Sequence, residues 1–238
     1  MAGPVKTEAV VLRSMRYGEA DRILHVYTPM RGKISAIAKG VRRSKSRFGG
    51  RLEPFFRLNL ELHEGRSDLM TVTGAETVSA YAVLRADEQA LNSAARACDS
   101  LGRVFDSGEP HPEVFNLLCS ALTLLDEHPE KATDEFQVAF RLKLLLAAGF
   151  APQLAACASC GEADELVGFS PAAGGVICAS CEAGSFELDA DTHRFLTDAL
   201  GRPLAETPSA DPRVIALADR AISETAAHHG QVRLKAIA

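Results

Sequence analysis

Hydrophobic and polar residues alternate along the first third of the chain with the two-residue period that is typical of β-strands. The clearest case is 56–63, where Phe56, Leu58, Leu60 and Leu62 alternate with polar or charged residues. Similar short segments stand apart from it, separated by Gly, Pro, Asp and Ser, at 9–13, 23–27, 33–39 and 69–73. Five short strands in this stretch predict a small closed barrel. We favour an OB-fold, although an SH3-like barrel would show much the same pattern.

After Tyr81 the apolar residues recur three or four positions apart, which is the period of a helix. Three helices are predicted before residue 150, and the third follows Thr133 as its cap and stops at Gly149. Its apolar surface is wide, so we place this helix at the centre of a bundle. Two more helices are predicted at 192–200 and 212–227.

The predicted fold class is therefore α+β and multidomain. A five-stranded OB-fold barrel is followed by an α-helical domain that contains an inserted four-cysteine, zinc-ribbon-like element. The boundaries that we predict are a barrel, a first helical part, the cysteine element and a closing helical part at 1–80, 81–150, 151–186 and 187–238.

Four of the six cysteines form two pairs with the same internal spacing, Cys157 with Cys160 and Cys178 with Cys181. A two-residue gap lets one turn direct both thiolates at a point, and two such turns complete the tetrahedron that Zn²⁺ prefers. Four thiolates leave no position for a water ligand, so we predict one structural Zn²⁺. The remaining two, Cys98 and Cys119, stand on apolar helical stripes and are predicted to lie in the core.

Two other interpretations of the cysteines are possible. A thioredoxin-like redox pair is disfavoured because both C-x-x-C units match each other and neither stands in a βαβ pattern. A zinc deaminase would use an H-x-E segment, which 111–113 and 128–130 both resemble. Its C-x-x-C motif follows a proline, however, and Ala156 and Ile177 occupy those places here.

The charge of the chain is divided between its two ends. Residues 1–80 carry 14 Lys and Arg against 8 Asp and Glu, a net charge of +6, whereas residues 81–238 carry 12 against 23, a net charge of −11. A polyanion is therefore expected to bind within the first 80 residues. Because no signal peptide or long apolar segment is visible, we expect a cytoplasmic, nucleoid-associated protein without a membrane partner.

A cationic segment at 39–57 contains one acid, Glu53, and seven cations, Lys39, Arg42, Arg43, Lys45, Arg47, Arg51 and Arg57. Gly and Ser residues between them allow a close approach of the backbone to phosphate. Tyr17 and Phe48 could stack on unpaired bases, unless Phe48 simply anchors the loop. A cationic run is often only a solvated surface, but its combination with a barrel favours nucleic-acid binding.

Several motifs together resemble the RecO family of bacterial recombination mediators. The first block comprises YGEADRIL at 17–24, AKG at 38–40 and LEPF at 52–55. The second comprises GFAPQL at 149–154, which leads into CASCG at 157–161. The resemblance covers essentially the whole chain.

The resemblance implies an N-terminal OB barrel, a helical domain, and a zinc-binding insertion in members that keep the four cysteines. It implies binding of single- and double-stranded DNA, strand annealing, and loading of RecA, together with RecR, onto DNA coated by single-strand binding protein. No catalytic residue is implied, and 232–235 looks like the closing helix of the family. The expected DNA-binding residues are Lys39, Arg42, Arg43, Lys45, Arg47 and Arg51.

Three further expectations concern a second binding site, the first turn and a rival function. Arg141 or Lys143 could form a cationic spot that receives the acidic C-terminal tail of single-strand binding protein. Glu19 and Asp21 are expected to orient Arg22 or to cap the turn between the first strands. The rival function is a zinc-stapled RNA-binding scaffold of the transcription or translation machinery, which would bind RNA and DNA equally and anneal neither.

Overall fold

The computed structural model describes residues 4–43, 46, 48–65, 68–106, 108–182 and 184–237. The chain forms two compact units, Met1–Pro129 and Glu130–Ala238. The first contains a β-barrel and helices, and the second contains helices and a small sheet beside the four cysteines. This confirms the predicted α+β fold class. The division between the units falls inside the helical segment predicted for 81–150.

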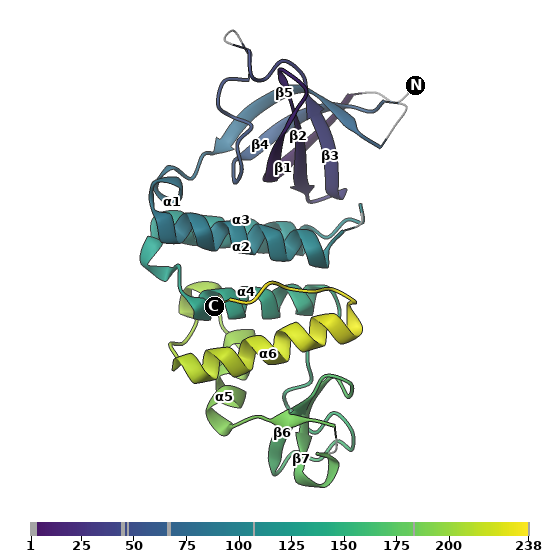
Figure 1. Ribbon diagram of the computed structural model, residues 1–238, viewed down its shortest axis with the longest axis vertical. Coiled ribbons are helices and arrows are strands. Elements are labelled where there is room, and N and C mark those ends of the chain that lie inside the picture. The colour runs from purple at the N-terminus through teal and green to yellow at the C-terminus, as the bar shows by residue number, and fades with distance from the viewer. Residues whose placement is uncertain are drawn as a thin grey trace. The chain divides into compact units, whose positions relative to one another are not determined.

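The barrel is closed, and its strands follow the order β1-β2-β3-β5-β4 (Figure 1). All neighbouring strands are antiparallel except β3 and β5, whose short parallel pairing closes the barrel. The strands are β1 at Pro4–Tyr17, β2 at Asp21–Thr28, β3 at Gly32–Ala38, β4 at Arg57–His63 and β5 at Met70–Ser79.

Strand β1 is much longer than the predicted 9–13, because it pairs with β4 along its first half and with β2 along its second. A register shift between Val11 and Arg13 allows the bend. The core behind it is filled by the alternating leucines of β4 and by Phe48 and Leu52 of the 39–56 loop, all of which are buried. The loop is therefore anchored in the barrel at its second half.

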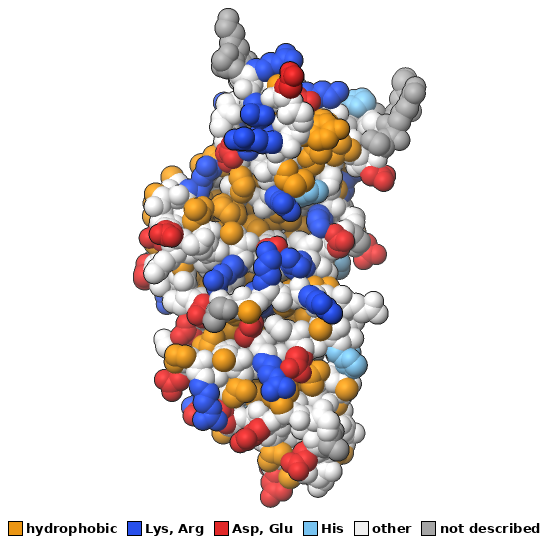
Figure 2. All heavy atoms as spheres, in the orientation of Figure 1, with side chains coloured by type: hydrophobic (Ala, Val, Ile, Leu, Met, Phe, Trp, Pro, Cys, Tyr) orange, Lys and Arg blue, Asp and Glu red, His pale blue; other side chains and the backbone are white. Residues whose placement is uncertain are grey.

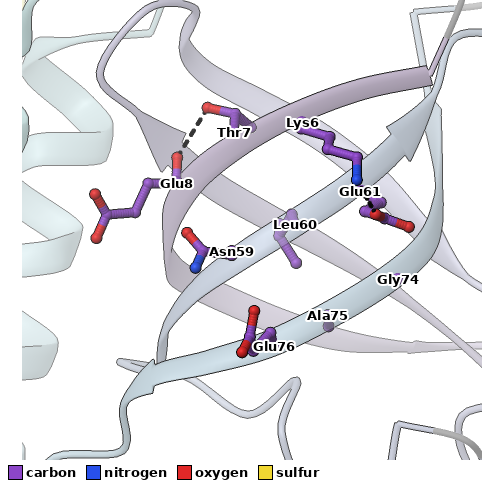
Figure 3. A pocket seen from close by; sticks show the side chains of 9 residues that line it. All are labelled: Lys6, Thr7, Glu8, Asn59, Leu60, Glu61, Gly74, Ala75 and Glu76. Carbon is purple, nitrogen blue, oxygen red and sulfur yellow. Dashed lines mark hydrogen bonds and ion pairs between the residues drawn. The ribbon is translucent and has the colours of Figure 1, made fainter.

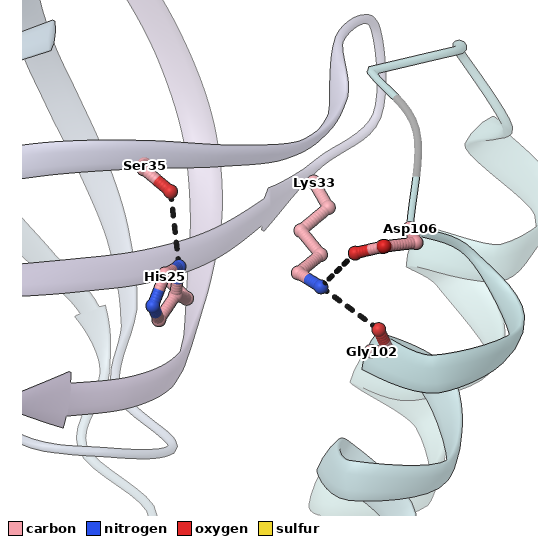
Figure 4. Close-up of polar contacts among 5 residues, drawn as sticks. All are labelled: His25, Lys33, Ser35, Gly102 and Asp106. Carbon is pink, nitrogen blue, oxygen red and sulfur yellow. Dashed lines mark hydrogen bonds and ion pairs between the residues drawn. The ribbon is translucent and has the colours of Figure 1, made fainter. Parts of the chain in front are cut away.

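The first unit continues with helices α1 at Ala82–Ala86, α2 at Glu88–Val104 and α3 at Pro112–Glu127. Lys33 of β3 reaches the C-terminal end of α2, where its Nζ donates to the Gly102 carbonyl at 2.9 Å and pairs with Asp106 (Figure 4). A cation is favourable at this end of a helix dipole. Tyr27 of β2 also packs edge-on against Phe105, with ring centroids 6.4 Å apart. These contacts join barrel and helices into one unit.

The second unit contains α4 at Asp134–Ala147, α5 at Ala190–Gly201 and α6 at Pro212–His229. The predicted cap is confirmed, because the Thr133 hydroxyl accepts from the Phe136 amide. Every residue from Phe136 to Leu142 is buried, so α4 is central as predicted. The small sheet has the order β7-β6-β8, and short 3₁₀ turns lie between the helices and strands. The bounds are β6 Leu166–Ser170, β7 Gly175–Cys178, β8 Phe186–Glu187, and turns Pro129–Lys131, Ala179–Cys181 and Leu204–Glu206.

The expectations for Arg141 and for the C-terminal segment are wrong, whereas the one for Lys143 stays a prediction. Arg141 is 1% exposed and pairs with Asp219 at 2.7 Å, so its guanidinium is an internal group and cannot receive a partner's tail. Lys143 donates to the Leu200 carbonyl at 2.9 Å at the end of α5, and burial lowers its pKa. The segment 231–237 is irregular where a closing helix was expected.

Candidate nucleic-acid interface and metal centre

The cationic loop begins where β3 ends, and its first turn is fixed against the turn between β1 and β2. The Gly40 amide donates to Asp21 Oδ1 at 2.8 Å, and the Arg42 amide donates to the Ala20 carbonyl at 2.9 Å. Arg42 Nη1 also donates to the Glu19 carbonyl at 3.0 Å. Residues 17–21 and 39–43 therefore form one joined surface, which we call the hairpin–loop surface.

The cations predicted to bind DNA are exposed wherever the structure describes them. These are Lys39, Arg42, Arg43 and Arg51, and none forms an ion pair with a described carboxylate. Lys45 and Arg47 lie outside the described residues. The two aromatic candidates differ, because Phe48 is 2% exposed and anchors the loop, whereas Tyr17 is 53% exposed. The stacking role considered for Phe48 is therefore wrong.

The remaining charges of the 39–57 segment are engaged within the barrel. Glu53, its one acid, pairs with Arg22 at 3.0 Å, and Arg22 also donates to the Ser14 hydroxyl. Arg57 pairs with Glu8 and lies 5.8 Å from the centre of the Phe115 ring. The negative charge of Glu53 is thus neutralised by Arg22, and Arg57 is paired and does not count among the cations available to DNA. Asp21 accepts a hydrogen bond from the loop at Gly40, while Arg22 bonds to Ser14 and Glu53. The expectation that Asp21 orients Arg22 is therefore wrong.

Two exposed cations were missed by the sequence analysis. Arg13 and Arg16 lie on the second half of β1, and no ion pair joins either to a carboxylate in the described part of the chain. Arg13 stands opposite His25, whose pKa is lowered by burial and by the nearby charges of Lys33 and Arg13. No local pattern marked Arg16, because the alternation breaks at Val10 and Val11 within the strand that carries it.

A different face of the barrel is acidic. The outer sides of β1, β4 and β5 form a groove of about 530 Å³ (Figure 3). Its lining includes Glu8, Glu61 and Glu76, while its lysine, Lys6, pairs with Glu61 at 2.7 Å. This groove is unsuited to phosphate. Figure 2 shows Lys and Arg side chains gathered over parts of the barrel, and Asp and Glu gathered over the β6–β7 region.

The four paired cysteines come together in the second unit. The Sγ atoms of Cys157, Cys160, Cys178 and Cys181 all lie within 4.8 Å of one another, and those of Cys160 and Cys178 are 3.7 Å apart. A tetrahedron with metal–sulfur bonds of about 2.3 Å has edges of about 3.8 Å, so the set fits a single ion. The turn that holds the first pair is closed by the Gly161 amide, which donates to the Cys157 carbonyl.

The charges at this cluster also favour a cation. Backbone amides, that of Cys178 first, lower the pKa of the Cys157 thiol to about 6. Hydrogen bonds with the neighbouring thiols, that of Cys160 first, raise the pKa of Cys181 to about 12, and repulsion by the charge of Cys157 adds to the shift. A metal ion among the sulfurs would remove that repulsion. The four cysteines could therefore hold a metal ion.

Two family models match the chain. "Recombination protein O N terminal" matches residues 1–81, and "Recombination protein O C terminal" matches residues 85–237. The chain belongs to the RecO family of DNA repair proteins. The predicted resemblance to RecO is thereby confirmed, and the RecO N-terminal model covers the barrel that carries the hairpin–loop surface.

Curated RecO proteins resemble the chain over most of its length. The DNA repair protein RecO of Rubrobacter xylanophilus is 40% identical over 210 residues, which cover 86% of this chain and 84% of that protein. RecO of Bifidobacterium adolescentis is 43% identical over 178 residues (73% and 72%), and RecO of Geobacter sulfurreducens 37% over 203 residues (83% and 81%). Within the residues described, no helix is long and apolar enough to cross a membrane.

Proposed function

We propose that this RecO-family protein binds DNA through the cationic loop of its barrel and anneals complementary single strands. The observation that supports the proposal most directly is that the cations of the loop are exposed, while its one acid is paired. Lys39, Arg42, Arg43 and Arg51 are exposed without carboxylate partners among the described residues, while Glu53 is paired with Arg22. Each phosphate that such a cation neutralises releases a counterion, which drives binding.

Annealing requires two like-charged strands to approach each other. A cationic surface screens the phosphates of a bound strand and leaves its bases available for pairing. The role is non-covalent and needs no catalytic residue. The wider function that we propose, on the resemblance to the RecO family, is loading of a recombinase onto DNA coated by single-strand binding protein, with RecR as a partner.

The metal that we propose for the four cysteines is a structural Zn²⁺. Four thiolates in a tetrahedral arrangement are typical of this ion, and they leave no open position for a water molecule. When bound, the ion would join the turn at 157–161 to the end of β7 and stabilise a segment that is too small to bury a core of its own. The barrel, not this acidic segment, is the proposed DNA surface.

The test compares a charge-reversal variant, Arg42→Glu/Arg43→Glu, with the parent at several salt concentrations. The control variant Arg194→Glu/Arg202→Glu has the same change in net charge but lies on α5 and its C-cap. We expect the loop variant to bind single-stranded DNA at least tenfold more weakly and to lose about 1.4 from the salt slope, at roughly 0.7 per contact. Annealing should fall in parallel.

Loop and control variants that bind and anneal alike would refute this function. Equal affinity for RNA and DNA, without annealing, would instead favour the RNA-binding scaffold. Both measurements use the full chain with its metal content determined on the same preparation, so that loss of the metal is not mistaken for loss of the DNA surface.

A further inference from the structure

The hairpin–loop surface contains an aromatic side chain that packing does not explain. Of the aromatic residues of the chain, all of which are described, Tyr17 is the one that is more than half exposed, at 53%. The other two tyrosines, Tyr27 and Tyr81, are 0% and 4% exposed. Exposing an apolar ring to water is unfavourable. An exposed ring on a cationic surface can, however, stack on an unpaired base.

The backbone pairing places Tyr17 beside the cationic loop. Tyr17 stands opposite Asp21 in the β1–β2 register, and Asp21 accepts the Gly40 amide at 2.8 Å. Arg16, the neighbour of Tyr17, is exposed, as are Lys39 and Arg42 across the joined turns. An exposed ring on a surface that also carries exposed cations suits a single strand, which presents both unpaired bases and phosphates.

Asp21 is one of two carboxylates, with Glu19, in a surface that also carries the exposed cations Lys39, Arg42 and Arg43. The charge of Asp21 repels phosphate, so a contribution to DNA binding must come from its contact with the loop. Gly40 has a positive φ of 66°, and its amide is held by Asp21 while its carbonyl accepts from the Arg43 amide at 3.1 Å. The bond to Asp21 therefore fixes the turn from which Lys39, Arg42 and Arg43 project.

We propose that the hairpin–loop surface is a binding site for single-stranded DNA, in which Tyr17 stacks on an unpaired base and Asp21 is a positioning residue for the cationic loop. This inference rests on the proposed function, because it names the strand form and two further residues of the same DNA surface. Duplex DNA has no free base face to offer Tyr17, so the site distinguishes the two forms through the ring.

The role of Tyr17 is tested with three variants, Tyr17→Leu, Tyr17→Phe and Tyr17→Trp. We expect Tyr17→Leu to bind oligothymidine about tenfold more weakly and to bind duplex of equal length within twofold of the parent. Tyr17→Phe should keep the parent affinity. Because the chain contains no Trp, Tyr17→Trp provides a single reporter whose fluorescence oligothymidine should quench and duplex should not.

The role of Asp21 is tested by comparing Asp21→Asn with Asp21→Ala. Both variants remove the same negative charge, but the asparagine keeps an oxygen that can accept the Gly40 amide. We expect Asp21→Asn to bind oligothymidine at least as tightly as the parent, and Asp21→Ala to bind severalfold more weakly with a shallower salt slope. Thermal unfolding of both variants, measured in parallel, separates this effect from a general loss of structure.

Two outcomes would overturn the inference and leave the proposed function intact. In the first, Tyr17→Leu weakens single-stranded and duplex binding equally or not at all, and the tryptophan is not quenched at saturation. In the second, Asp21→Ala binds as tightly as Asp21→Asn, which would mean that only the charge of Asp21 matters. Failure of the Arg42→Glu/Arg43→Glu variant to weaken binding would refute the proposed function itself.

Discussion

The buried ion pair between Arg141 and Asp219 predicts that the second unit depends strongly on both charges. Arg141 Nη1 lies 2.7 Å from Asp219 Oδ1, and their side chains are 1% and 15% exposed. The other carboxylate oxygen of Asp219 accepts from the Ile237 amide at 3.4 Å. The perturbation is Arg141→Met, which keeps most of the side-chain volume on α4 and removes the guanidinium.

The expected loss of stability follows from the Asp219 charge, which this variant leaves buried without its cation. The Asp219 carboxylate stays largely buried and loses its cation, and breaking a buried pair in this way costs about 3–5 kcal/mol. Typical domains are stable by only about 5–15 kcal/mol. For a unit of this size, roughly 4 °C per kcal/mol implies a fall in melting temperature of about 10–20 °C. The double variant Arg141→Met/Asp219→Asn removes both charges and should recover most of the loss.

Thermal unfolding of the parent, both single variants and the double variant, followed by circular dichroism in excess zinc, measures these effects. Oligonucleotide binding serves as the control below the transition, because the cationic loop belongs to the first unit. A shift of less than about 3 °C for Arg141→Met, or a double variant whose loss equals the sum of the two single losses, would refute the reasoning about an uncompensated charge.

Four other features give expected outcomes. Removing the metal with a chelator, or replacing Cys178 with Ser, should reduce the metal content from one ion per chain to below about 0.1, and should shift the unfolding of the second unit while leaving barrel-based DNA binding intact. In Gly175→Ala the added Cβ would lie 2.2 Å from the Gln153 carbonyl oxygen and force the backbone beside the cysteines apart. Half of the metal should then be released at a lower chelator concentration than in the parent. Gly50→Ala, where the space around the Cβ is open, is the control. The lowered pKa of His25 means that the unfolded chain binds this proton more readily, so stability should fall as the pH drops below about 6.5, less steeply in His25→Asn. Cys98, whose pKa burial raises to about 12, should react with a thiol reagent at pH 8 only after unfolding.

The sequence predicted the existence of most elements because their periodicity is local. The alternation of 56–63 marked β4, and the wide apolar surface of 134–147 marked a central helix. The length of β1 could not be predicted in the same way. Val10 and Val11 are both buried, since the bulge there interrupts the alternation, so the pattern breaks in the middle of a continuous strand. Short α1 at Ala82–Ala86 has too few residues to show a period.

Candidate sites were predictable to the extent that they are local in sequence. The cysteine quartet follows from two tight turns, and the cationic loop from a run of residue types. Ion pairs are different, because Arg22 and Glu53 are 31 residues apart and Arg141 and Asp219 are 78 apart. Nothing in the sequence near Arg141 distinguishes an exposed arginine from one that packs inside α4, and only the position of α6 decides it.

These distant pairs also decide which cations of the first 80 residues are available to a ligand. Of these 14 cations, five in the described part of the chain pair with carboxylates, namely Lys6, Arg22, Arg31, Lys33 and Arg57. At most nine remain to exchange counterions for phosphates. At roughly 0.7 per contact, the salt slope for single-stranded DNA should not be steeper than about −6. A steeper slope would mean either that paired cations leave their carboxylates for phosphate or that cations of residues 81–238 also contact the DNA.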